Sequence, residues 1–182
     1  GPNSLAVVGS PRLTNEALFT LRKFATELVG TENYTATDAF SLIPFFENLG
    51  APLATHNDIR HAATILLIGG EPEELQPLTG KQMRQAVRNS GAKLIVINSV
   101  PIRLVEQSSQ FIHVNNGSLD AAVLALHSPS GAHQAFEKMG VEASEFATLQ
   151  QTLTDTQGDI VIMFGGELSS AAQTIVAQLP FA

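Results

Sequence analysis

The chain has 182 residues, 44% hydrophobic and 15% charged, which suits one domain with a proper core and argues against disorder. Its net charge of −7 and its ten basic residues exclude a nucleic-acid platform, which needs clustered lysine and arginine. The absence of cysteine excludes disulfides, thiolate zinc sites and cysteine-ligated iron–sulphur clusters within these residues.

A short apolar strand, a turn of small residues and an amphipathic helix recur along the chain. The first strand is Leu5–Val8, and Gly9-Ser10 forms the turn that follows it. Apolar side chains then recur at helical spacing from Leu13 to Leu28, which predicts a helix. Either Ser10 or Thr14 is placed to cap that helix.

The second unit of this kind begins with the strand Thr64–Ile68, which enters Gly69-Gly70-Glu71. The helix after it is predicted to bury Leu75, Leu78, Met83, Ala86 and Val87. Ser90-Gly91 stops this helix ahead of the strand Lys93–Ile97.

A last strand, Ile160–Phe164, enters Gly165-Gly166-Glu167, and helical spacing continues from Leu168 to Leu179. The two Gly-Gly-Glu turns are interpreted as independent solutions to one strand-to-helix turn. Weaker patterns predict an edge strand in 31–37, a short helix in 39–49, a strand over 109–114, a helix over 119–126 and a helix around 146–153.

Strands that are continuously apolar are typical of parallel sheets covered by helices on both faces. Successive strand, crossover helix and strand imply right-handed units. We therefore predict a three-layer α/β/α fold with a mostly parallel sheet, in a single domain over 1–182, with 127–140 as an internal connector. Because residue 1 is not methionine, we expect the chain to be a fragment of a larger subunit. The longest apolar runs, such as Ile65–Ile68, are far too short to span a bilayer, so no direct membrane insertion is expected.

The glycines at the strand ends could hold a phosphate, because backbone N–H groups and helix dipoles converge there. No turn reads Gly-x-Gly-x-x-Gly, and glycine also permits a tight exit from a sheet, which is the favoured interpretation.

Other polar groups have structural explanations. Glu71, Glu73 and Glu74 sit at a predicted helix start, where acidic side chains favour the positive dipole end. Arg84 and Arg88 are interpreted as a solvated helix face. The five histidines lack metal-binding spacing, and no catalytic residue or metal site emerges from spacing alone.

Three segments resemble the molybdopterin oxidoreductases, the family that includes formate dehydrogenases and nitrate reductases. They are Gly69-Gly70-Glu71-Pro72 after its strand, Gly91–Ile97, and Asn116–Leu119 before an alanine-rich helix. Gly9-Ser10 with Thr14–Glu16 is similar to the family's Gly-Ser…Thr-Asn-Glu motif. The resemblance implies the three-layer fold of this family's cofactor-binding domains.

Two positions depart from the family pattern. Asn98 stands where active members have aspartate, and Leu119 stands where they have the acidic residue of Gly-Thr-Asp. The resemblance assigns those carboxylates to the guanine or ribose part of the bis-pterin cofactor. Leucine removes such a contact, and the adjacent Asp120 points in another direction on a helix.

A scaffold that is retained while its cofactor ligands are lost resembles the large iron–sulphur subunit of NADH:quinone oxidoreductase, respiratory complex I. This resemblance implies a structural, cofactor-free domain that supports NADH-to-quinone electron transfer without chemistry of its own. It also implies contacts with other subunits and with the remainder of its own chain, on the cytoplasmic face of the inner membrane, with iron–sulphur clusters only elsewhere in the parent protein. The alternative is a domain that binds molybdopterin guanine dinucleotide in an active molybdenum oxidoreductase, such as a formate dehydrogenase or nitrate reductase relative.

If a small molecule binds, the carboxyl ends of the strands are the predicted location. The residues expected around it are Gly9, Ser10, Gly69, Glu71, Asn98, Gly117 and Gly165.

Overall fold

The computed structural model describes residues 4–10, 12–36, 41–128 and 132–179. These form two compact units, Gly1–Ser41 and Leu42–Ala182, and the single domain expected over 1–182 stays a prediction. The first strand pairs within the N-terminal unit, and the larger unit has a sheet of its own.

The N-terminal unit is a small parallel βαβ arrangement. It consists of β1 (Val7–Gly9), α1 (Asn15–Lys23), the π-helical continuation η2 (Phe24–Val29) and β2 (Tyr34–Ala36). The predicted helix and the predicted edge strand are thereby confirmed. Of the two candidate caps, Thr14 is the one used, since its hydroxyl accepts the Ala17 N–H at 3.3 Å.

The larger unit alternates strands and helices along the chain, as predicted. Its elements are α2 (Ile43–Glu47), α3 (His56–His61), β3 (Thr64–Ile68), α4 (Pro72–Leu75), α5 (Pro77–Gln85), η3 (Ala86–Ser90), β4 (Lys93–Asn98), η4 (Arg103–Gln107), β5 (Gln110–His113), α6 (Leu119–His127), α7 (His133–Met139), α8 (Ala143–Thr154), β6 (Ile160–Phe164) and α9 (Ser170–Ala177). Gly91 ends η3 in the left-handed region with φ 68°, which confirms the predicted helix stop.

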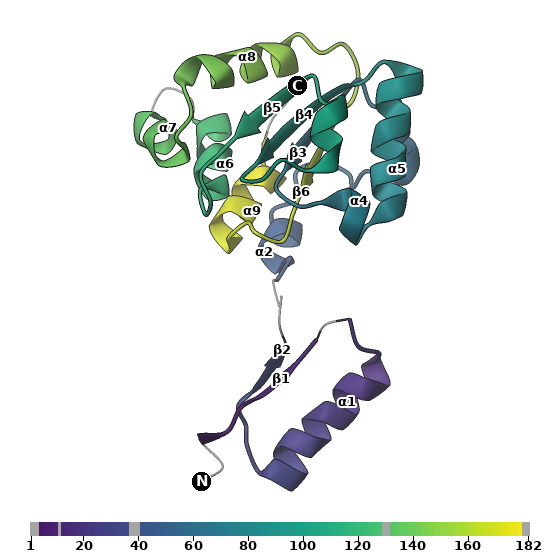
Figure 1. The fold of residues 1–182 in the computed structure, drawn as a ribbon, viewed down its shortest axis with the longest axis vertical. Coiled ribbons are helices and arrows are strands. Elements are labelled where there is room, and N and C mark those ends of the chain that lie inside the picture. Colours follow the sequence, from purple (N-terminus) through teal and green to yellow (C-terminus); the bar gives the residue numbers. More distant parts are fainter. Residues whose placement is uncertain (1–3, 11, 37–40, 129–131, 180–182) are drawn as a thin grey trace. The chain divides into compact units, whose positions relative to one another are not determined.

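The sheet of the larger unit has the order β5-β4-β3-β6, and all its pairings are parallel. Successive side chains of each strand enter two different cores. Leu66 and Ile68 pack under α6, α8 and α9, whereas Ile65 and Leu67 pack under α3 and α5. Figure 1 shows α5 on one side of the sheet and α6 and α8 on the other. The three-layer α/β/α prediction is confirmed for this unit.

The helix after β3 differs from its prediction. Gln76, with φ −141°, interrupts it, and Pro77 starts α5 afresh, so the apolar stripe does not run straight through. Met83 and Ala86 are buried as expected. Leu75 and Leu78 are 58% and 66% exposed, and their predicted burial is wrong.

The segment 127–140, expected to be a connector, contains a packed helix. Residues 129–131 lie outside the described residues, and α7 occupies most of the remainder. Met139 is fully buried in the core under α6, and its carbonyl accepts the Asn115 N–H at 2.8 Å. Among the described residues no helix is long and apolar enough to cross a membrane.

The helix α3, absent from the sequence prediction, begins with a capping box. Both the N–H and the hydroxyl of Thr55 donate to the Asp58 carboxylate, at 2.7 and 2.8 Å, and the Asp58 N–H donates to the Thr55 hydroxyl. Hydrogen bonds from the Thr55 backbone and side chain lower the pKa of Asp58 below its ordinary 3.8.

This lowered pKa makes the first turn of α3 sensitive to acid. The folded-state pKa of Asp58 lies below the unfolded one, so the stabilisation is complete above about pH 4 and is lost as the pH falls through the folded pKa. We expect amides of His56–His61 to exchange faster with solvent as the pH falls through that range, relative to intrinsic rates. Asp58→Asn is expected to abolish this pH dependence. An unchanged Asp58 titration midpoint in Thr55→Ala, followed by NMR, would contradict this account.

Candidate functional site at the carboxyl edge of the sheet

The two Gly-Gly-Glu turns lie side by side at the carboxyl edge of the sheet. Because β3 and β6 pair in parallel with Ile68 opposite Phe164, both strands end at the same level. The Gly165 N–H donates to the Ile68 carbonyl at 2.9 Å, which extends the pairing into the turns. Residues 69–71 and 165–167 are thus neighbours in space.

Gly69 and Gly70 turn the chain sharply out of β3, with φ values of 65° and 70°. Side chains at these positions would be strained, because left-handed backbone favours glycine. A Cβ atom on Gly69 would also lie 2.9 Å from Cδ1 of Leu119 and 3.1 Å from Oε2 of Glu167. The first glycine is therefore required by conformation and by close packing.

Glu167 bridges the two turns. Its Oε1 accepts the Gly70 N–H at 3.1 Å, and its Oε2 lies against Gly69 and Gly165. A backbone N–H at a strand end is a group that an anionic ligand would use in this type of fold. Here the chain supplies its own carboxylate to that N–H.

Asn98, the last residue of β4, holds the same turn from the other side. Its side chain is 5% exposed, and its Nδ2 donates to the Gly70 carbonyl at 2.9 Å. Its Oδ1 accepts the Val100 N–H at 3.3 Å. Both polar atoms of the side chain are therefore engaged within the protein, which makes Asn98 a buried positioning group at this edge.

The loop after β5 completes the edge. Gly117 has φ 75°, and Leu119 begins α6 with its side chain buried against Gly69. Asp120 accepts the Ser169 N–H at 3.1 Å, so its carboxylate binds the start of the segment leading to α9. That Asp120 cannot take the place of an acidic residue at 119 stays a prediction.

The structure brings Gly69, Asn98 and Gly165 together around Gly70, with Glu71 following directly as the residue before α4. Gly117 lies in the neighbouring loop. Gly9 and Ser10 belong to the N-terminal unit, where a Cβ on Gly9 would lie 2.6 Å from Cδ2 of Leu21 and the Ser10 hydroxyl accepts the Arg12 N–H. A site shared by both units stays a prediction.

Glu167 was not among the predicted site residues. Its signal was present in the repeated Gly-Gly-Glu turn, but the contact to Gly70 spans 97 residues and requires knowing that β3 pairs with β6. Ser169 caps α9, because its hydroxyl accepts the Ala172 N–H at 3.3 Å.

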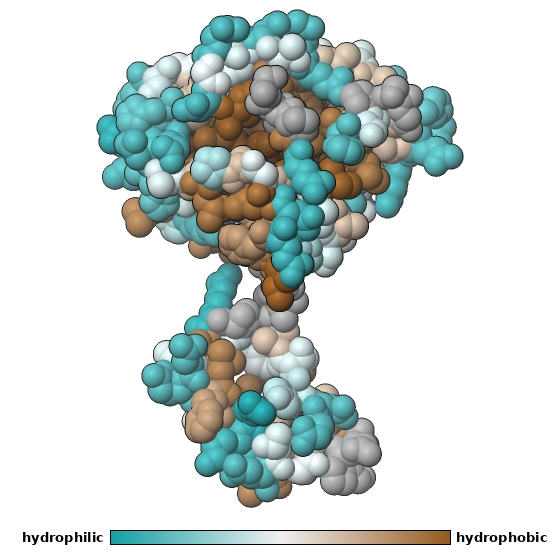
Figure 2. Space-filling model, turned by 180° about the vertical axis from the view of Figure 1, so that it is seen from behind, coloured by the Kyte–Doolittle hydropathy of each residue, from teal (hydrophilic) through white to brown (hydrophobic). Residues whose placement is uncertain are grey.

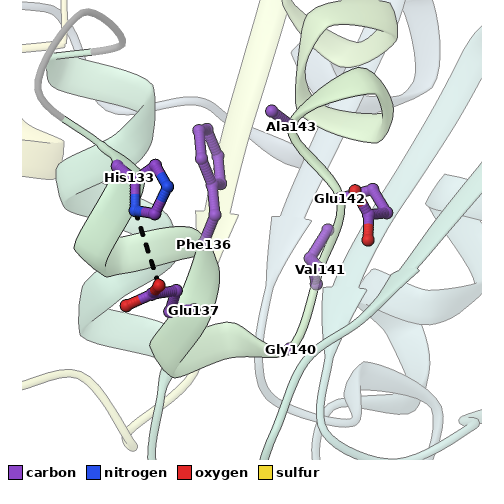
Figure 3. Close-up of a pocket in the computed structure, with 7 residues that line it drawn as sticks. All are labelled: His133, Phe136, Glu137, Gly140, Val141, Glu142 and Ala143. Carbon is purple, nitrogen blue, oxygen red and sulfur yellow. Dashed lines mark ion pairs between the residues drawn. The ribbon is translucent and has the colours of Figure 1, made fainter.

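Among the described residues no group of three or more histidine, cysteine, aspartate or glutamate residues could hold a metal ion. A pocket of about 460 Å³ lies elsewhere, between α7 and the start of α8 (Figure 3). His133 and Glu137 face each other across one turn of α7 at 3.7 Å, and Phe136 points into the pocket. None of its lining residues belongs to the predicted site.

The residues at the sheet edge do not fit a dinucleotide in this arrangement. Glu167 places a carboxylate at Gly70, where a pyrophosphate would need a free N–H, and Leu119 offers no hydrogen bond to a ribose or guanine. The side chains whose hydrogen bonds hold the Gly70 turn and the segment before α9 are Asn98, Asp120 and Glu167, none of which is a cation. The edge is built to hold its own turns together.

No family model matches the chain. It is similar to three curated proteins: the oxidoreductase-type protein YjgC of Bacillus subtilis (28% identical over 124 residues), the assimilatory nitrate reductase of Haloferax mediterranei (30% over 122 residues) and the formate dehydrogenase-like protein YrhE of Bacillus subtilis (25% over 132 residues). The matches cover 65%, 64% and 69% of this chain and 13%, 17% and 14% of those proteins. The chain thus spans only about a sixth of the relatives' length or less. These relatives are oxidoreductases of the molybdopterin family, and the chain is similar to one segment of them.

Proposed function

We propose that the chain is a structural, cofactor-free domain of a larger molybdopterin-type oxidoreductase. The observation that carries this proposal is the hydrogen bond from the Gly70 N–H to the Glu167 carboxylate at 3.1 Å. It occupies the strand-end turn at which a ligand would be expected in an open α/β sheet.

Electrostatics support the same conclusion. Glu167 is exposed to water, where two unit negative charges 4 Å apart repel by about 1 kcal/mol. A phosphate approaching Gly70 would meet Glu167 at such a distance, and it would have to displace that side chain. Asn98 is 5% exposed and already bonded to Gly70 and Val100, so it is held in place by the protein itself.

At a finer level, we propose the large iron–sulphur subunit of complex I as the parent protein. The supporting observations are Asn98 and Leu119 in place of acidic residues, and the absence of cysteine from the chain. In this proposal the domain supports NADH-to-quinone electron transfer, and the iron–sulphur clusters lie in other parts of the subunit. Its partners are other subunits of the complex and the remainder of its own chain, at the cytoplasmic face of the inner membrane.

A second candidate is a domain that binds molybdopterin guanine dinucleotide in an active molybdenum oxidoreductase. Two consecutive positive-φ glycines at a strand end favour it, as do relatives named as a nitrate reductase and formate dehydrogenase-like proteins. It requires Glu167, which is solvent-exposed, to swing away from Gly70. It also predicts molybdenum or tungsten in the complete assembled protein, whereas the structural proposal predicts neither.

Titration with guanosine 5′-diphosphate separates the two candidates. We expect no calorimetric signal from the chain at about 1 mM nucleotide, because Glu167 holds the Gly70 N–H. Such a result corresponds to a Kd weaker than about 1 mM. Binding with a Kd near 10 µM, with NMR shifts at Gly69, Gly70 and Gly165, would reject the structural proposal. In that case Glu167→Gln should tighten binding about tenfold through loss of a repulsive charge. Glu145→Gln, at the start of α8, is the matched control and should leave affinity unchanged.

A further inference from the structure

The N-terminal unit is an incomplete α/β layer. Its sheet has only β1 and β2, and α1 buries none of its residues completely. Phe19 and Leu28 are 64% and 77% exposed, and Figure 2 shows hydrophobic residues in brown at the surface of this unit. Two-stranded sheets are marginally stable alone, and parallel sheets are usually covered, so this unit lacks part of its normal packing.

The missing packing lies on one side. A groove of about 390 Å³ is lined by one turn of α1 (Leu18, Phe19, Leu21 and Arg22) and by all three residues of β2, Tyr34–Ala36. No residue of β1 lines it. The groove therefore lies between α1 and β2, on the side of the unit to which β1 does not contribute.

We propose that this groove, with the outer edge of β2, binds a parallel β-strand with apolar side chains, supplied by polypeptide outside residues 1–182. Strand addition pairs main-chain groups of the edge while alternate side chains fill a pocket. The existing pair is parallel, and side chains of α1 line the same groove as β2, so a further parallel strand beside β2 would contact them. The inference holds for the N-terminal unit whether or not the larger unit binds a dinucleotide.

The chemistry of the lining defines the strand. Leu18, Phe19 and Leu21 call for apolar side chains on the helix-facing side. Arg22 lies 5.7 Å from the centroid of the Tyr34 ring and is a cation of the groove lining, so an acidic residue at one end of the strand would be favoured.

The length of the relatives supports polypeptide outside these residues as the source. In them the matched segment is only 13–17% of the chain, so most of each relative lies outside it. A second copy fits less well. Two β2 edges related by a two-fold axis would run antiparallel, and repeated addition of β2 to β1 would form an open fibre.

A tethered strand tests the proposal on the full chain. A Thr-Val-Thr-Val-Thr segment is fused ahead of residue 1 through a Gly/Ser linker of about 15 residues, because a parallel strand needs a crossover of a dozen or more. Tethering raises the effective concentration to about millimolar. Amide exchange of Tyr34–Ala36 should be at least tenfold slower than in a Thr-Pro-Thr-Pro-Thr fusion, whose prolines cannot donate to the ladder. Phe19→Asp should remove this protection. The matched control is Leu28→Asp, because Leu28 is also an exposed apolar residue but lies outside the groove, and this variant should retain the protection.

Three results would overturn the proposal. One is equal exchange of the β2 amides in the two fusions while β1–β2 pairing persists. Another is slow exchange of these amides already in the unfused chain at low concentration, which would mean that the larger unit covers the edge. The third is a concentration-dependent dimer of the unfused chain that Phe19→Asp dissociates, which would identify a second copy as the occupant.

Discussion

Gly165→Ala is expected to destabilise the larger unit by about 3 kcal/mol, at the upper end of the overpacking range. A Cβ atom at this position would collide with the Gly70 backbone, lying 2.7 Å from its Cα and closer still to its N, and with Oε2 of Glu167. Two of these three contacts are backbone atoms fixed by β3, so they cannot move away cheaply. The β3 and β6 turns would be forced apart, and the hydrogen bond from Gly165 to Ile68 would be lost with them.

Hydrogen exchange of the β3 amides measures this effect in the larger unit alone. A loss of 3 kcal/mol corresponds to exchange roughly 100-fold faster, given a factor of ten for each 1.4 kcal/mol. Gly91→Ala is the matched control, because Gly91 has φ 68° but nothing within 4 Å of a Cβ atom. It should cost only about 1 kcal/mol from backbone strain. Equal effects of the two substitutions would show that the turns at the sheet edge are not tightly packed.

The layers of the fold were accessible from the sequence because burial on both faces makes a strand apolar throughout. β3, β4 and β6 carry this pattern, and all three lie where it places them. The position of Gly91 followed from the need for a left-handed residue after a helix. These features depend only on residues that are close together in the sequence.

Two helices were missed for different reasons. α3 has six residues, of which only Ile59 is buried, so its sequence shows no periodic pattern of apolar residues. Its capping box, Thr55-x-x-Asp58, was nevertheless recognisable in the sequence. α7 lies in a segment interpreted as a connector from its composition, yet Ala132, Phe136 and Met139 recur at helical spacing. Attention to spacing within short polar segments would have found it.

The sequence predicted where in the fold the site would lie, but it predicted only some of the residues that form it. The rule that parallel strands end at one edge brought Gly69, Asn98 and Gly165 together correctly. It could not identify the contact between Glu167 and Gly70, because periodicity does not tell which strands are neighbours. The division into two units was likewise hidden, since the first strand has the same apolar pattern as the others.

Arg84 shows how long-range pairing alters a local interpretation. The sequence places Arg84 and Arg88 on a solvated face, but Arg84 forms an ion pair with Glu73, whose side chain is only 7% exposed. The Gly80 position brings α5 close to α4 here, since a Cβ atom on it would lie 3.0 Å from the Glu73 Cα. The solvated-face prediction is therefore wrong for Arg84.

Arg84→Met is expected to destabilise the larger unit by about 2 kcal/mol, or roughly 30-fold faster exchange of the β3 amides. Removing one partner of a fully buried pair costs about 3–5 kcal/mol, because the other charge is left without compensation. The smaller value applies here because the Arg84 side chain is 35% exposed and water screens the pair. Arg88→Met, on the exposed next turn, is the matched control and should change stability by less than about 0.5 kcal/mol.

The double variant Arg84→Met/Glu73→Met distinguishes a charge left unpaired from lost side-chain packing. If the cost of Arg84→Met comes from the uncompensated Glu73 carboxylate, removing that carboxylate should recover most of the lost stability, since apolar replacement of a buried pair is often neutral. If the cost comes from packing of the arginine stem, the double variant should be no more stable than the single one. An Arg84→Met effect as small as that of Arg88→Met would mean that the pair contributes no more than an exposed salt bridge.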